Sequence, residues 1–290
     1  MLPFSLDPGW LALIAASLFG SSMITTRNGL EYLSSSTGVT ISVLTTALIY
    51  LVLAPWQMPA EPWALPAFWI FVITGLFHPM LSMSLSMEST KRLGPTVSAT
   101  VSSISPLLSA AGAVLFLHEA PNINIVLGTV GVVVGVMALS WQGGAGMRSW
   151  LNPAILLPLA TAGVRGGVHV IAKVGMRLTP IPFMAVFTSY MVSSVGLVSI
   201  NAKRGKLPAT WRNVGFFWFV LTGFITGGAL IFMYSAFATG EVVVVSPIIS
   251  SYPVFTLLWM LVLRPRDVLS LRILLGVACT VGGVMLIHSR

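Results

Sequence analysis

The sequence contains ten long apolar stretches, and they restrict the folds that the chain can adopt. Each stretch holds roughly 20 apolar residues, the length that an α-helix needs to cross a hydrocarbon core. Hydrophobic residues make up 56% of the chain and charged residues 8%, too few polar groups to cover a soluble surface. The sequence therefore predicts an all-α integral membrane protein with ten transmembrane helices, at residues 9–27, 38–55, 66–88, 95–117, 123–141, 153–174, 181–200, 213–237, 242–263 and 269–288.

The two halves of the chain carry the same features at an offset of about 147 residues. Ser105-Pro106-Leu107 recurs as Tyr252-Pro253-Val254, and two glycine pairs in the last span of each half follow the same offset: Gly128 and Gly135, Gly276 and Gly283. Each half holds five spans. Because five is odd, the second half must enter the membrane from the opposite side. We expect two inverted five-helix repeats, residues 1–145 and 146–290.

The sequence lacks the residues that several classes of protein need for their function. Cys279 is the only cysteine, and the chain has no phosphate-binding glycine loop, no hydrolase serine motif and no His/Cys/Asp cluster at metal spacing. We therefore expect no enzyme activity, no cofactor and no metal. No Lys or Arg precedes the first span, so we expect it to be a retained helix and not a cleaved signal peptide.

The net charge of +8 is spread over the connections between spans, which favours anionic lipid over nucleic acid as its partner. The expected partners are a small-molecule substrate, membrane lipid and, as an open possibility, a second copy in a homodimer. Ten basic residues lie in or beside the odd-numbered connections, and three lie beside the even-numbered ones or at the C-terminus. Ten spans place both termini on one side, and this count places that side outside.

The paired proline and glycine motifs, together with Phe116-Leu117-His118-Glu119, resemble the drug/metabolite transporter superfamily, specifically its EamA-type ten-helix members. The resemblance implies a substrate cavity between the halves, transport of metabolites such as amino acids or sugars without ATP, and cytoplasmic termini. That side conflicts with the charge count, so orientation stays open. The sequence departs from the pattern at Arg264-Pro265-Arg266-Asp267, where a counterpart of Glu119 is expected.

Arg165 is the leading candidate for substrate binding, because it lies near the centre of the sixth span. A charge at that depth costs about 2.5–3.5 kcal/mol, and all seven acidic residues lie near span ends. A water-filled cavity or an anionic substrate would compensate the charge; bonding to backbone carbonyls or snorkelling is the structural alternative. His169 and Lys173 follow on the same helical face. We expect His169 either in the cavity or packed against a neighbour, and Lys173 as an interfacial anchor.

Further candidate substrate-binding residues come from four other spans. His78 lies in the third span with Ser82 one turn later, and the remaining candidates are Ser98 and Ser102 in the fourth span, Thr226 in the eighth and Tyr252 in the ninth. Serines on one face suit either a wet cavity or close helix packing. The glycines of the fifth and tenth spans suit close helix packing, within a monomer or between monomers. Three prolines are expected to bend helices around the cavity: Pro79, Pro106 and Pro253.

Together these features predict a secondary transporter or facilitator in the cell membrane, plasma or bacterial inner. It would move a small polar metabolite with a carboxylate or other anionic group by alternating access between the halves, and amino acids are the leading substrate class. One alternative is an exporter of lipophilic cations, which the absence of an acid deep in a span disfavours. The other is a non-transporting sensor or membrane enzyme, for which the chain leaves no soluble domain.

Overall fold

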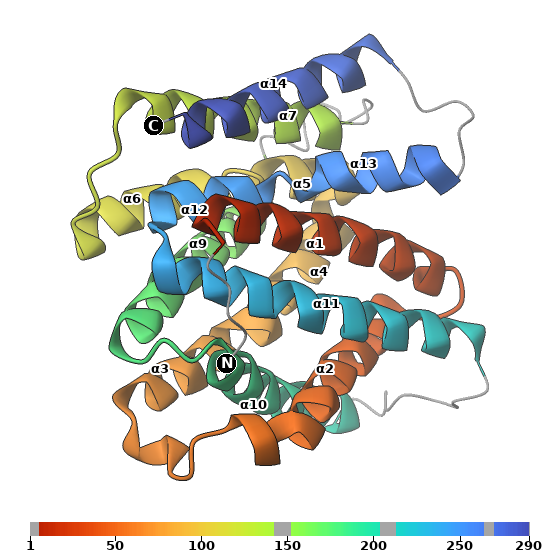
Figure 1. Ribbon diagram of the computed structural model, residues 1–290. Coiled ribbons are helices and arrows are strands. Elements are labelled where there is room, and N and C mark those ends of the chain that lie inside the picture. Colours follow the sequence, from red (N-terminus) through yellow and green to blue (C-terminus); the bar gives the residue numbers. More distant parts are fainter. Residues whose placement is uncertain (1–5, 142–151, 204–212, 264–269, 290) are drawn as a thin grey trace.

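In a computed structural model, which describes residues 6–141, 152–203, 213–263 and 270–289, every regular element is a helix (Figure 1). Ten helical segments of these ranges are long and apolar enough to cross a membrane, and they confirm the ten expected spans. Their bounds are Pro8–Leu30, Ser35–Gln57, Pro66–Leu93, Val97–Leu117, Ile123–Ser140, Pro153–Leu178, Pro182–Lys203, Val214–Thr239, Val242–Val262 and Leu271–His288. The expected boundary between residues 145 and 146 lies outside the described residues.

Seven spans are built on one long helix each. These are α1 (Pro8–Leu30), α2 (Ser35–Gln57), α7 (Ile123–Ser140), α9 (Leu156–Leu178), α10 (Pro182–Lys203), α11 (Val214–Thr239) and α14 (Leu271–His288). Short turns η1 (Pro62–Ala64) and η3 (Pro153–Ile155) precede the third span and α9.

Local side-chain caps fix where several of these helices begin. The carboxylate of Asp7 accepts a 2.7 Å bond from the Gly9 N–H at the start of α1, and the Asn122 side chain accepts a 2.9 Å bond from the Ile125 N–H at the start of α7. Each bond satisfies a backbone donor that has no partner inside its own helix. Short polar residues between the apolar runs therefore set the ends of the spans.

Three spans are interrupted near their middle. The third consists of α3 (Pro66–Gly75), the irregular turn η2 (Leu76–Leu81) and α4 (Ser82–Leu93), and it breaks at His78, whose φ of −140° and ψ of 128° are not helical. The fourth consists of α5 (Pro95–Ser102) and α6 (Ser105–Leu117), and the ninth of α12 (Val242–Ser250) and α13 (Tyr252–Leu263).

Pro106 and Pro253 stand at equivalent places in the fourth and ninth spans. Each is the second residue of the second half-helix, α6 or α13. Proline suits the first turn of a helix because the backbone N–H that it lacks would have no helical partner there. These two prolines, which we expected to bend their helices, thus begin new half-helices after a break.

The two halves interlock through matched hydrogen bonds, all between side-chain hydroxyls and backbone carbonyls. Helices α2 and α10 are equivalent in the repeat, and each bonds to the third span of the other half. The four bonds run from Ser42 to Phe219, from Ser189 to Phe71, from Thr46 to Gly223 and from Ser193 to Gly75. Donors and acceptors both follow the repeat offset, so the contacts of one half are reproduced in the other, as two related repeats require.

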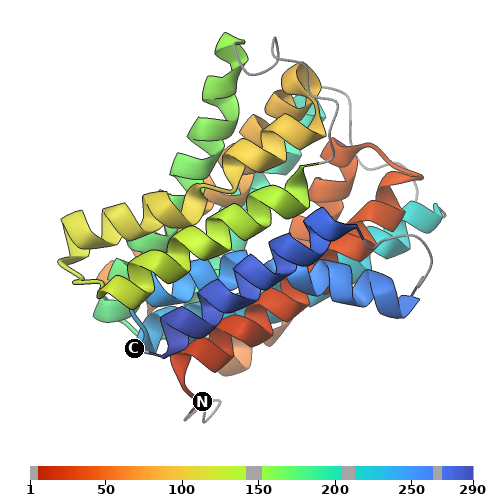
Figure 2. The ribbon, with the colours of Figure 1, turned by 90° about the horizontal axis from the view of Figure 1, so that it is seen from above.

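Helices α7 and α14 end their repeats and pack side by side at one end of the molecule, with α2 and α10 at the other (Figures 1 and 2). A Cβ atom at Gly128 would lie 2.5 Å from the Gly283 carbonyl oxygen, and one at Gly135 would lie 2.6 Å from that of Gly276. Only glycine permits this approach of two backbones. The glycines therefore pack helices within the monomer, one of the two roles left open by the sequence.

The start of α1 and the end of α14 lie at the same end of the helices (Figure 2). The rings of Trp10 and His288 are 5.9 Å apart there, nearly edge to face. We call this end of the molecule the terminal face. The connection from α6 to α7 and the one from α11 to α12 lie at the same face, because four and eight spans precede them and an even number of spans returns the chain to the side where α1 starts.

Candidate functional site

Three basic side chains come together in the interior of the helix bundle. Arg165 and His169 lie one turn apart near the middle of α9, and His78 lies in η2, which packs against α9. The charge of Arg165 acts on both histidine rings, and that of His169 acts on His78. All three side chains are partly buried. We call these residues the basic cluster.

Arg165 has no hydrogen bond and no ion pair with any residue that the structure describes. Its Nε atom is buried without a partner. The ion pairs within the described ranges join Arg92 to Glu88 and Arg177 to Glu119. The cost of holding the guanidinium at this depth is thus not offset by a carboxylate of the described chain. Its donors stay available for another group.

His169 is fixed by a chain of hydroxyl groups that joins the two repeats. Its Nδ1 lies 2.7 Å from the Ser246 Oγ on α12, which lies 2.6 Å from the Ser109 Oγ on α6. Ser109 also donates to the Pro106 carbonyl, at 2.9 Å. With the Ser109 proton committed there, Ser246 donates to Ser109 and His169 donates from Nδ1. This assignment leaves Nε2 of a neutral His169 as a hydrogen-bond acceptor.

His78 is held in a similar way within its own span. Its Nδ1 lies 2.7 Å from the Ser82 Oγ, and Ser82 is fully buried. The non-helical backbone at His78 separates α3 from α4 at the depth of Arg165. The break in the third span therefore places a second imidazole beside the first.

Four other candidates lie apart from these contacts. Ser102 donates to the Pro158 carbonyl and Thr90 donates to the Ser98 Oγ, both at 3.4 Å, and both serines are buried. These bonds belong to the packing of α4, α5 and η3–α9. Thr226 and Tyr252 are partly exposed, and neither side chain has a hydrogen bond to the basic cluster. A role for these four residues in substrate binding stays a prediction.

Lys173 does not act as an interfacial anchor, and that expectation was wrong. The residue is only 6% exposed, and its Nζ donates a 2.8 Å bond to the Phe237 carbonyl. Phe237 lies in the last turn of α11, where carbonyls have no helical partner and the helix dipole favours a cation. The position of α11 beside α9 decides this role, and the sequence of α9 alone does not show it.

Glu119 joins the two repeats at the terminal face. Its side chain is 2% exposed, its Oε2 accepts a 3.0 Å bond from the Val243 N–H in the first turn of α12, and its Oε1 lies 3.7 Å from Arg177 Nη2 on α9. A carboxylate at a helix N-terminus is favoured by the dipole and by the free N–H groups. We call this contact the Glu119 link. In the sequence, only the acidic residue of the Phe116–Glu119 motif pointed to the Glu119 link.

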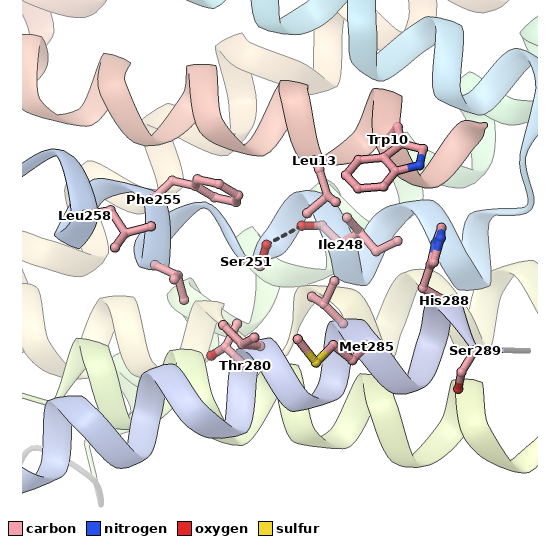
Figure 3. Close-up of a pocket in the computed structure, with 13 residues that line it drawn as sticks. Trp10, Leu13, Ile248, Ser251, Phe255, Leu258, Thr280, Met285, His288 and Ser289 are labelled. Atoms are coloured by element: carbon pink, nitrogen blue, oxygen red, sulfur yellow. Dashed lines mark hydrogen bonds between the residues drawn. The ribbon is translucent and has the colours of Figure 1, made fainter. Parts of the chain in front are cut away.

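A separate cavity of about 440 Å³ lies between α1, α12, α13 and α14 (Figure 3). Its walls are mainly apolar, and none of the predicted substrate-binding residues lines it. It is therefore distinct from the basic cluster.

Comparisons with known proteins agree with this architecture. The model of the EamA-like transporter family matches the chain twice, over residues 9–141 and 152–289. A solved structure titled "Crystal structure of protein" superposes with a TM-score of 0.77 at 16% identity, covering 96% of this chain and 94% of its own, and it is one of 29 matching chains. At that identity the likeness shows the fold alone. No curated protein sequence matches. Because the two family matches cover nearly the whole chain, the protein belongs to the EamA-like transporter family, integral multi-pass membrane transporters built from two repeats.

Proposed function

We propose that the protein is a secondary transporter or facilitator for a small metabolite with a carboxylate or another anionic group, and that amino acids are its leading substrate class. One observation carries the proposal: Arg165 lies in the membrane interior with no partner in the described chain. A planar guanidinium binds a carboxylate through two parallel hydrogen bonds, which are strong where water is scarce.

The two histidines supply what an amino acid needs beyond its carboxylate. An α-ammonium group requires acceptors, and the acidic residues lie too near the span ends to provide them. Nε2 of neutral His169 is an acceptor that the hydroxyl chain leaves free, and His78 lies beside it. A zwitterion would then bind with its carboxylate on Arg165 and its ammonium on imidazole nitrogens.

The repeat arrangement supports alternating access as the mechanism. The breaks of the fourth and ninth spans allow half-helices to move as units, and Ser109 and Ser246 join those spans beside His169. At the terminal face the Glu119 link ties the first repeat to α9 and α12 of the second. For the substrate site to open toward that face, this link must break.

The basic cluster disfavours a lipophilic cation as substrate. A substrate that carries a positive charge and no anionic group is repelled by Arg165, and the repulsion grows in a medium of low dielectric constant. No described acidic residue lies in the cluster to reverse that sign. Family membership in turn points to a transporter rather than an enzyme.

The proposal is tested by counterflow in proteoliposomes that contain the purified full chain. The panel holds zwitterionic amino acids, organic acids and quaternary amines, with protein-free liposomes as the control. We expect uptake of at least one carboxylate-bearing compound and none of the quaternary amines. Uptake confined to the amines would refute the anionic assignment and favour the exporter of lipophilic cations.

A further inference from the structure

The cavity between α1, α12, α13 and α14 opens on the outer surface of the bundle. Three of the residues at its mouth, Trp10, Leu258 and Met285, are each more than two-fifths exposed. They belong to membrane-spanning helices, and α14 lies at the edge of the molecule (Figure 1). The mouth therefore faces the interior of the bilayer and not the aqueous loops.

Along α14 the cavity is about as long as one leaflet is deep. Along α14 its wall runs from Thr280 to Ser289, a rise of about 13 Å at roughly 1.5 Å per residue. The hydrocarbon core is about 30 Å thick, so along α14 the cavity extends from the terminal face to near the bilayer centre. Its other wall continues past Ser251, at the midspan break between α12 and α13, to Phe255 and Leu258 on α13.

The surface of the cavity is almost wholly apolar, and side chains that carry hydrogen-bonding groups stand at one end of it. At the terminal face Trp10, His288 and Ser289 supply hydrogen-bonding groups (Figure 3). Asp7 caps α1 there by accepting a bond from Gly9, and His288 lies beside Gly9. Deeper in the membrane the wall is formed mainly by aliphatic and aromatic side chains, such as Leu13, Phe255 and Val284. An occupant that fits has a polar group at the interface and an apolar chain below it.

The polar side chains at this end of the cavity are not reproduced at the equivalent positions of the repeat. At the offset of about 147 residues Trp10 corresponds to Leu156 or Leu157, and His288 corresponds to Ser140 or Trp141. The symmetry-related place, between α9 and α7, thus has no counterpart of Trp10 on α9 and no imidazole. Tryptophan and histidine at a membrane interface suit the ester and phosphate groups of lipids.

We propose that this cavity binds one acyl chain of a glycerophospholipid from the leaflet at the terminal face. The ester and phosphate groups lie at Trp10, His288 and Ser289, and the chain runs inward toward Ser251. The bound chain packs against the α12–α13 break, where one half-helix meets the other. The site is independent of the transported substrate, because it shares no residue with the basic cluster.

The test uses the full chain in nanodiscs of phosphatidylethanolamine and phosphatidylglycerol, with a small fraction of phosphatidylethanolamine that carries a diazirine at the middle of one acyl chain. After irradiation, peptide mass spectrometry locates the label. We expect labelling at Phe255, Val284 and Met285 several-fold above that at Leu274, an exposed residue of the same α14 outside the cavity.

Two variants separate a bound lipid from general contact with the bilayer. Val284→Trp fills the cavity and should reduce this labelling several-fold, whereas the matched control Leu274→Trp should leave it unchanged. His288→Ala keeps the cavity open, and it should move the label along α14 because the head group loses a partner. This second variant keeps the test informative if Val284→Trp does not fold.

Three outcomes would overturn the proposal. The first is equal labelling of Leu274 and the cavity wall, which would mean that lipid only surrounds the helix. The second is labelling that neither Val284→Trp nor His288→Ala changes. The third is a dimer that Val284→Trp dissociates, because a second copy would then occupy the cavity.

Discussion

Replacing Glu119 tests the contact that joins the two repeats at the terminal face. A charge-assisted hydrogen bond to a buried backbone N–H is worth about 1.5–3 kcal/mol, and its loss leaves the Val243 N–H without a partner. The ion pair with Arg177 adds only a few tenths of a kcal/mol, because the Arg177 side chain is 47% exposed. Glu119→Ala should therefore lower the free energy of unfolding by about 2–3 kcal/mol. Glu119→Gln should lower it by about 1 kcal/mol, because an amide oxygen still accepts the bond.

Thermal unfolding of the purified protein in detergent measures this effect. For a chain of 290 residues the Glu119→Ala loss corresponds to a fall in unfolding temperature of roughly 3–5 °C. The matched control is Glu88→Ala, which removes the other described ion pair, at a site where both side chains are well exposed. It should change the unfolding temperature by about 2 °C or less. If Glu119→Ala proves no more destabilising than Glu88→Ala, the Glu119 link does not hold the repeats together.

Two further predictions follow from the helix packing. Gly135→Val should separate α7 from α14 and leave little folded protein on size-exclusion chromatography, because its Cβ would meet the Gly276 carbonyl; Gly282→Val, whose Cβ would have open space, should remain monodisperse. An equal yield for both variants would refute the close packing of these helices. Cysteines placed near the chain ends in a Cys279→Ala background should react with a membrane-impermeant maleimide from the same side of the membrane. Reaction from opposite sides would mean that the spans have been miscounted.

The spans and the repeat could be predicted from the sequence because both depend on local properties. Apolar length fixes each span, and the offset between Pro106 and Pro253 marks equivalent places whatever surrounds them. Ser246 shows the limit of this reasoning. It stands in a run of valines, its equivalent in the first repeat is Ala99, and nothing nearby in sequence indicates that it contacts His169.

The long-range partners of single polar residues could not be predicted for the same reason. Lys173 looked like an anchor because it lies near the end of its helix, yet the C-terminal turn of α11 lies against it. Ser98 and Ser102 share a polar face that suits a cavity and helix packing equally well, and their hydrogen bonds are to α4 and to Pro158. In each case the deciding neighbour belongs to another span.

The most direct test of the account is the concentration dependence of transport by Arg165 variants, measured in proteoliposomes with a carboxylate-bearing substrate found by counterflow. Arg165→Gln removes the charge that binds the carboxylate, so KM should rise roughly 10–100-fold, the equivalent of one lost charge-assisted bond. Arg165→Lys should recover only part of the loss, because an ammonium lacks the two-pronged geometry. Arg272→Gln, at an exposed position of α14, should behave as the wild type. If well-folded Arg165→Gln transports the same substrate with unchanged KM and rate, Arg165 is a structural residue and the anionic site does not exist.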